Sequence, residues 1–230
     1  LGMGAGLRTE LLGPNGFVLA PLPNHLFARD TTCWIYGGVS LNPMARPARR
    51  RETVHLEAIY AFHPLFSDAA FERWLGGVDV EHGSSTIEGG DVAVLGNGAV
   101  LIGMGERTTA QAVELLAARL LGSGAVQRVL AVALPRRRAF MHLDTVITMV
   151  APDTFIAYPG VAEQLRCWSL RSHETSGRTR VSAEPDVFTA IASALGLGSL
   201  QILTTGGDAV EAEREQWDDG NNTLALAPGL

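Results

Sequence analysis

One layout of residues recurs four times along the 230-residue chain and constrains its fold more than any other feature. Each copy reads as a short strand with acidic residues or histidine, a turn with Gly or Asn, and a second apolar strand. A helix and a returning strand usually follow. The copies begin with the segments 24–42, 85–109, 139–160 and 215–229. A recurring supersecondary unit indicates an α/β chain of strand–strand–helix–strand modules that pack against one another.

The second copy carries the clearest local signals. Residues 91–95 and 99–103 are expected to form a hairpin around the sequence GNG, because Asn and Gly accept the positive φ angles of tight turns. Thr108 is the expected N-cap of a helix over 109–122. The apolar run 126–134 should then return as a buried strand.

The first and last copies differ in how complete they are. In the first, residues 49–64 supply the helix, and Pro64 should end it. The last copy would need a helix beyond Gly229, and the chain does not begin with Met. We therefore expect the chain to be a piece of a longer protein.

Composition limits the class of protein and its partners. Apolar residues make up 47% of the chain, enough to bury the core of one large domain or two small ones. The net charge is -6 and there is no basic stripe, which argues against a nucleic acid partner. No run approaches the roughly 20 apolar residues of a membrane helix, and residues 1–12 lack the charged and apolar regions of a signal peptide, so we expect a cytoplasmic protein with no membrane partner. The two cysteines are expected to be free thiols.

Polar residues occupy an equivalent place, near the start of the first strand, in three of the modules. If the modules surround a common axis, five side chains would meet at one centre: Asp30, Glu88, Asp91, His142 and Asp144. Crowded carboxylates raise one another's pKa unless a cation lies between them. One histidine with scattered acidic residues is a poor set of ligands for zinc. The chain also lacks the compact DxDxDG type of loop that binds calcium. A guanidinium, which is planar and offers five donors, fits better.

The segment AFMHLDTVITM, residues 139–149, is expected to form a buried strand. Strand alternation would place His142 and Asp144 on one face and Leu143 on the other, in the core. A single histidine on an apolar strand is more often a structural core residue. The nearby Asp144 and the other acidic motifs favour a functional interpretation instead.

Five motifs in order, FARD, IEGGD, GMGERTT, MHLDT and WDDGNN, resemble those of the arginine deiminases. That family belongs to the guanidino-group-modifying superfamily, and its catalytic domain is a five-bladed pentein α/β propeller of ββαβ modules around a pseudo-fivefold axis. The resemblance implies hydrolysis of L-arginine to L-citrulline and ammonia through a thiouronium intermediate on a cysteine, with no cofactor and no metal. It also implies that residues 1–230 are an incomplete catalytic propeller domain, without the family's N-terminal module and helical insertion and without its C-terminal nucleophile segment.

The resemblance also implies roles for individual residues. Asp30 and Asp144 would hold the substrate guanidinium, and Glu88 would bind it and keep His142 in place. His142 would protonate the departing ammonia and then activate water. The remaining candidates are Arg107 and Arg49 for the substrate carboxylate, with Arg49 favoured over Arg51; Asn24 and Phe27 for the substrate pocket; Asp91 for either substrate contact or support; and Asp218 or Asp219 as weak candidates for any role.

Neither cysteine matches the nucleophile of the family. Cys33 lies in the strand after FARD and Cys167 lies in LRCWSL, so the chain is expected to be inactive. One alternative is a non-catalytic module that binds arginine or self-associates, and we expect a homo-oligomer. Another is an enzyme for a different guanidine, such as agmatine, methylated arginine or an amidino donor. The other five histidines fit no constellation and are interpreted as surface or structural residues.

Overall fold

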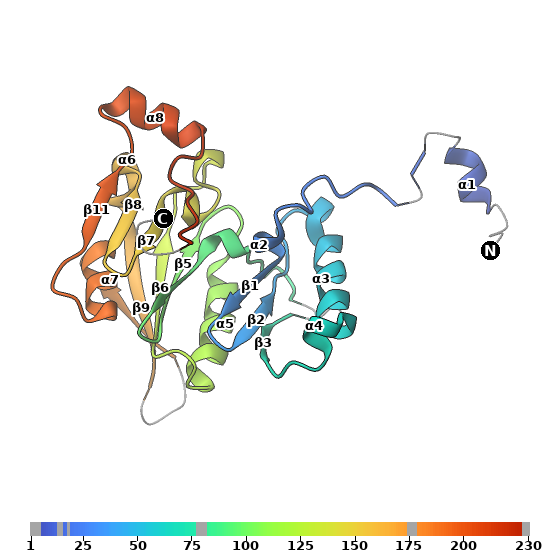
Figure 1. Cartoon of the computed structure of the whole chain (residues 1–230), viewed down its shortest axis with the longest axis horizontal. Coiled ribbons are helices and arrows are strands. Elements are labelled where there is room, and N and C mark those ends of the chain that lie inside the picture. Colours follow the sequence, from blue (N-terminus) through green and yellow to red (C-terminus); the bar gives the residue numbers. More distant parts are fainter. Residues whose placement is uncertain (1–5, 13–15, 18, 77–81, 174–178, 227–230) are drawn as a thin grey trace.

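The computed structural model describes residues 6–12, 16–17, 19–76, 82–173 and 179–226, and its strands form three sheets in a mixed α/β arrangement (Figure 1). Each sheet contains the same unit: an antiparallel strand pair followed by a helix and a strand parallel to the second of the pair. The strand–strand–helix–strand module is therefore confirmed for three of the four expected copies.

The first module forms the sheet of order β1-β2-β3. Its elements are β1 (Thr32–Ile35), β2 (Gly38–Leu41), α3 (Arg50–Phe62) and β3 (Glu72–Leu75). Helix α3 buries Leu56 and Tyr60 against Val39 and Leu41 of β2. The helix ends directly before the His63–Pro64 pair, as the sequence predicted, because proline disfavours helical backbone in the residue before it.

The second module forms one side of the five-stranded sheet, in the order β6-β5-β4, with β4 at the edge. Its elements are β4 (Val92–Gly96), β5 (Ala99–Met104), α5 (Ala110–Gly122) and β6 (Arg128–Ala133). Asn97 has a φ of 49°, which gives the tight turn expected at GNG. The predicted N-cap was wrong by one residue: Thr109 accepts the hydrogen bond from the Ala112 N–H, while the Thr108 hydroxyl donates to Asp91.

The third module is interrupted by a hairpin that the sequence analysis missed. Its elements are β7 (Ile147–Ala151), β8 (Thr154–Ala157), α7 (Val187–Leu195) and β11 (Gln201–Thr204), and between β8 and α7 lie α6 (Pro159–Ala162), β9 (Arg166–Ser172) and β10 (Thr179–Glu184). Strand β9 pairs antiparallel with β6, so the hairpin extends the sheet of the second module. This exchange ties the second and third modules together.

The fourth expected copy does not begin with a strand. Residues 215–217 end helix α8 (Ala209–Trp217), and the described residues after it, 218–226, contain turns and irregular backbone. The strand–turn–strand layout expected for the segment 215–229 is therefore wrong in its described part. The last part of the copy, 227–229, lies outside the described residues.

Strands β5 and β6 of the five-stranded sheet are buried on both faces, which explains why they are continuously apolar. Leu101 and Leu130 face a core shared with β7, β8 and α7, whereas Val100 and Val129 face a core shared with α5 and β3.

No helix in the described part of the chain is long and apolar enough to cross a membrane. The remaining elements are α1 (Leu7–Leu12), α2 (Ala28–Thr31) and α4 (Pro64–Ser67), with 3-10 turns η1 (Pro47–Arg49), η2 (Gly89–Asp91), η3 (Arg138–Phe140) and η4 (Leu143–Thr145).

Candidate active site

A short helical turn precedes the first strand of each module and carries an acidic residue. Asp30 lies in α2 before β1, Asp91 in η2 before β4, and Asp144 in η4 before β7. Turn η2 contacts both of the other turns, so the three acids meet although they are far apart in sequence. The expected centre of polar residues is therefore formed where the modules meet.

The strand predicted over 139–149 is wrong in its first part. Residues 143–145 form a 3-10 turn, and β7 begins only at Ile147. The Thr145 hydroxyl donates to the carbonyl of His142 at 2.7 Å, a local bond that competes with strand pairing. His142 and Asp144 still reach the centre, but the turn places them there rather than strand alternation.

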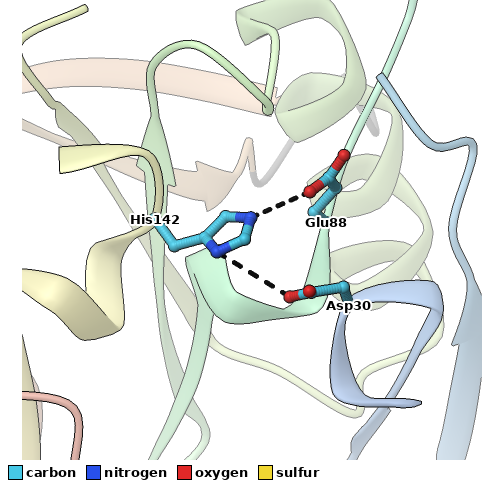
Figure 2. Close-up of side chains that lie close together, drawn as sticks. All are labelled: Asp30, Glu88 and His142. Atoms are coloured by element: carbon cyan, nitrogen blue, oxygen red, sulfur yellow. Dashed lines mark hydrogen bonds and ion pairs between the residues drawn. The ribbon is translucent and has the colours of Figure 1, made fainter. Parts of the chain in front are cut away.

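His142 and Glu88 form a direct pair in this centre (Figure 2). The Nε2 atom of His142 lies 2.9 Å from Oε2 of Glu88, and its Nδ1 atom lies 3.8 Å from Oδ1 of Asp30. Glu88 is fully buried, and His142 is 8% exposed. Gly90 gives the imidazole its space, because a Cβ at this position would lie 2.8 Å from the ring.

The charges around His142 favour its protonated form. Burial alone would lower the pKa of His142, but the hydrogen bond with Glu88 and the negative charges nearby raise it to about 9. Burial would raise the pKa of Glu88, yet the bond and charge of His142 and the charge of Arg107 lower it. The two residues therefore form an ion pair at neutral pH, with a proton held on the imidazole.

Asp91 and Asp144 differ in how their oxygens are used. Burial raises the pKa of Asp91 to about 7, and its two oxygens accept from Thr108 Oγ1 at 2.6 Å and from the Leu143 N–H at 2.9 Å. Burial raises the pKa of Asp144 to about 6, and its Oδ1 atom is buried without a hydrogen-bond partner among the described residues. Asp91 is thus in a supporting position, whereas Asp144 has an acceptor free for a ligand.

Arg49 is the most constrained of the predicted substrate-binding residues. Its guanidinium donates to Asp30 at 2.7 Å, to Glu52 at 2.9 Å, and to the carbonyls of Asn24 and Phe27, each at 3.2 Å. The side chain is buried, unlike the exposed position typical of an arginine run. Asn24 and Phe27 contribute their backbone carbonyls here, and both residues are exposed to solvent.

Two other arginines contact the acids of the centre. Arg107 donates to Glu88 at 3.2 Å, and its Nε atom is buried without a hydrogen-bond partner in the described structure. Arg29, which the sequence analysis did not select, lies 3.4 Å from Asp144. Arg51, the less favoured candidate, instead donates to the carbonyl of Ala20.

The WDDGNN motif, which covers the last residue of α8 and the turn after it, packs beside the acidic centre. The Thr148 hydroxyl lies within hydrogen-bond distance of the carbonyls of both Asp144 and Asn221, and Asn221 is buried. The charge of Asp219 contributes to the raised pKa of Asp144. Asp218 is the C-cap of α8. The motif therefore lies beside the site, although its fold is a helix end and turn.

Both cysteines are buried. Burial raises the pKa of the Cys33 thiol to about 11 and that of Cys167 to about 12. Both are free, as predicted. Cys33 belongs to the core beneath the second sheet, and Cys167 belongs to the core on its other side.

Asp30, Glu88 and His142 could also offer ligand atoms to a metal ion, since one atom from each lies within 4.8 Å of the others. The guanidinium groups of Arg49 and Arg107 already face two of these acids. The charge balance therefore suits a centre that receives guanidinium groups.

A pair of histidines outside this centre, His25 and His55, lies with ring nitrogens 3.0 Å apart, a contact that the sequence analysis missed.

Comparisons with known proteins show the family and the type of fold. The family model for arginine deiminase matches residues 4–230. The fold resembles the product-bound N-terminal domain of ArgZ, an arginine dihydrolase from cyanobacteria (14% identity, TM-score 0.57, 90% of this chain and 60% of that one). It also resembles unliganded AgrE (16% identity, TM-score 0.57, 90% and 24%) and a mutant of AgrE in complex with L-arginine (16%, 0.56, 90% and 25%). The chain thus spans less than two thirds of each protein.

The modular fold and the acidic centre define a pentein-type protein of the guanidino-group-modifying class. Within that class, the chain belongs to the arginine deiminase family.

Proposed function

We propose that the chain is the guanidinium-binding and proton-transferring part of a hydrolase that converts L-arginine and water to L-citrulline and ammonia. The observation that carries the proposal is the buried Glu88–His142 pair, set between Asp30 and Asp144 where three modules meet. The modules are proposed to be blades of the five-bladed pentein propeller.

A guanidinium is the cation that this centre suits best. It is always charged, so the acids around it can stay ionised in a buried site. Its five donors pair with carboxylates two at a time. The free Oδ1 atom of Asp144 supplies one acceptor, and Asp30 and Glu88 supply others that now accept from the chain's own arginines.

In the proposed reaction, a cysteine thiolate bonds to the guanidinium carbon of arginine. The bond from this carbon to one terminal nitrogen then breaks, and the proton on His142 leaves with that nitrogen as ammonia. Neutral His142 next takes a proton from water, whose oxygen bonds to the thiouronium carbon. The carbon–sulfur bond breaks, and citrulline leaves. The ion pair with Glu88 suits the first step, because it keeps the proton on His142 at neutral pH.

Recognition of the substrate carboxylate is proposed to begin with Arg107. Its Nε–H has no hydrogen-bond partner among the described residues, so it can donate to a carboxylate without breaking an existing hydrogen bond. Arg49 would first have to release Asp30 or Glu52 to bind a carboxylate. Agmatine, which lacks the carboxylate, is therefore the ligand that tests this assignment.

We propose that the 230 residues bind arginine but do not turn it over. Neither cysteine is placed to attack, because both are buried and their thiol pKa values are raised to about 11 and about 12. A thiol in such surroundings forms little thiolate near neutral pH.

Two measurements test the proposal. Isothermal titration should detect arginine binding by the wild-type chain, about tenfold or more weaker binding by Asp144→Ala, and unchanged binding by Asp68→Ala, an exposed surface acid. Absence of binding by the wild type would refute the proposed site. An assay for citrulline should find no product, and turnover that survives replacement of both cysteines would refute the thiouronium mechanism.

A further inference from the structure

We infer that Thr108 and Asp91 are positioning residues, which hold the Glu88–His142 pair in its bonded geometry through a closed ring of hydrogen bonds. The inference rests on the proposed function for what the pair does. The ring itself is a property of the fold, and it can be tested without arginine.

The ring can be followed from the backbone of Glu88. The Glu88 N–H donates to Thr108 Oγ1 at 3.2 Å, and this hydroxyl donates to Asp91 Oδ2 at 2.6 Å. The other oxygen, Asp91 Oδ1, accepts the N–H of Leu143 at 2.9 Å. Leu143 follows His142, whose ring returns to the Glu88 carboxylate at 2.9 Å. The ring therefore joins the segments of both members of the pair.

The residue types at these positions match what the ring requires. A hydroxyl accepts one bond and donates another, so Thr108 can join an N–H to a carboxylate. When ionised, the carboxylate of Asp91 can accept on both oxygens, as these two bonds require. Both side chains are almost completely buried, where an unmade hydrogen bond costs more than at the surface. Gly103 leaves the room needed, because a Cβ there would lie 2.7 Å from Asp91 Oδ1.

The ring also sets the charge beside the imidazole. The Thr108 hydroxyl lowers the pKa of Asp91, against the larger effect of burial, and the negative charge of Asp91 raises the pKa of His142. Loss of the hydroxyl should therefore leave Asp91 more often neutral. His142 would lose part of the charge that keeps it protonated, although neither Thr108 nor Asp91 is hydrogen-bonded to the imidazole in the described structure.

The test is a titration of His142 by NMR in the histidine-labelled chain, with its signal assigned by its absence in His142→Gln. Thr108→Val removes the hydroxyl and keeps the shape. We expect the midpoint of His142 to fall by about 0.5–1 pH unit. Thr108→Ser, which restores the hydroxyl, should return the midpoint to the wild-type value. Thr154→Val removes a buried hydroxyl in β8, outside the ring, and should leave the midpoint unchanged.

A folded Thr108→Val chain with a wild-type midpoint would overturn the inference, as would an equal shift in Thr154→Val. If Thr108→Val does not fold, Asp91→Asn decides, because it keeps the size of the side chain and removes its charge. It should lower the midpoint, and an unchanged midpoint overturns the inference. Arginine titrations of the same samples are read separately, so failure to bind arginine would count against the proposed function and leave the ring standing.

Discussion

Replacement of Glu88 by Gln should weaken the dependence of stability on pH in the alkaline range. A histidine with a raised pKa in the folded state stabilises the fold fully below its unfolded pKa, and this stabilisation is lost as the pH rises through the folded pKa. For His142 the window runs from 6.5 to about 9. At about 1.4 kcal/mol per pKa unit, the stabilisation is roughly 3 kcal/mol below that window.

Glu88 should supply a large share of this stabilisation. Its hydrogen bond comes first among the causes that raise the pKa of His142, and the more distant acids Asp91, Asp30 and Asp144 follow. We assign it about half, or roughly 1.5 kcal/mol. Glu88→Gln keeps the size of the side chain and removes the charge, so its pH-dependent cost should be greatest near pH 6.5 and should vanish above the window.

Urea unfolding of the wild type and of Glu88→Gln at several pH values between 6.5 and about 10 measures how the free energy of unfolding of each depends on pH. Asp144, with a pKa of about 6, titrates mainly below this range, and Asp91, with a pKa of about 7, titrates in its lower part, so His142 dominates its upper part. Glu114→Gln, at an exposed site on α5, is the matched control. If Glu88→Gln loses stability with rising pH as steeply as the wild type, then Glu88 does not hold the proton on His142.

Three further predictions concern other parts of the site. Arg49→Ala should lower the free energy of unfolding by about 3–5 kcal/mol, because it leaves buried carboxylates unpaired, whereas the exposed Arg50→Ala should cost less than about 0.5 kcal/mol; equal costs in urea unfolding would contradict this. Gly90→Ala should weaken arginine binding by about tenfold or more in calorimetry, because the new Cβ meets the His142 ring; Gly198→Ala, which points into open space, should bind normally. Both cysteines should resist a thiol reagent in native buffer and react in denaturant, and rapid native labelling would contradict their burial.

The module pattern could be predicted from sequence because each unit is marked by local signals. The turn at Asn97, the cap next to Ala110 and the stop before Pro64 act within a few residues, so they can be read along the chain. The hairpin β9–β10 could not be assigned to its sheet in this way. Its partner β6 lies more than 30 residues earlier, and only the packing of two modules selects that pairing.

The acids of the site could be predicted, but their surroundings could not. Motif order brought Asp30, Glu88 and His142 to attention, and the structure places them together. The turn at 143–145 was missed because the apolar segment around it, 139–149, also suits a strand, and a hydrogen bond from Thr145 favours the turn. The role of Thr108 was missed for a similar reason: as a predicted helix cap it already had a sufficient local explanation.

The three acids around the proposed ligand differ in how readily they can accept a new guanidinium. Asp30 is bound to Arg49, whose side chain is 6% exposed, and Glu88 is bound to Arg107, whose side chain is 10% exposed. Breaking either pair would leave a buried charge, which is costly. Asp144 is 3.4 Å from Arg29, whose side chain is 46% exposed, and an exposed partner in such a pair contributes little because water can replace it. Asp144 is therefore the carboxylate that an incoming guanidinium can reach at the lowest cost. The Asp30–Arg49 and Glu88–Arg107 pairs can then stay intact.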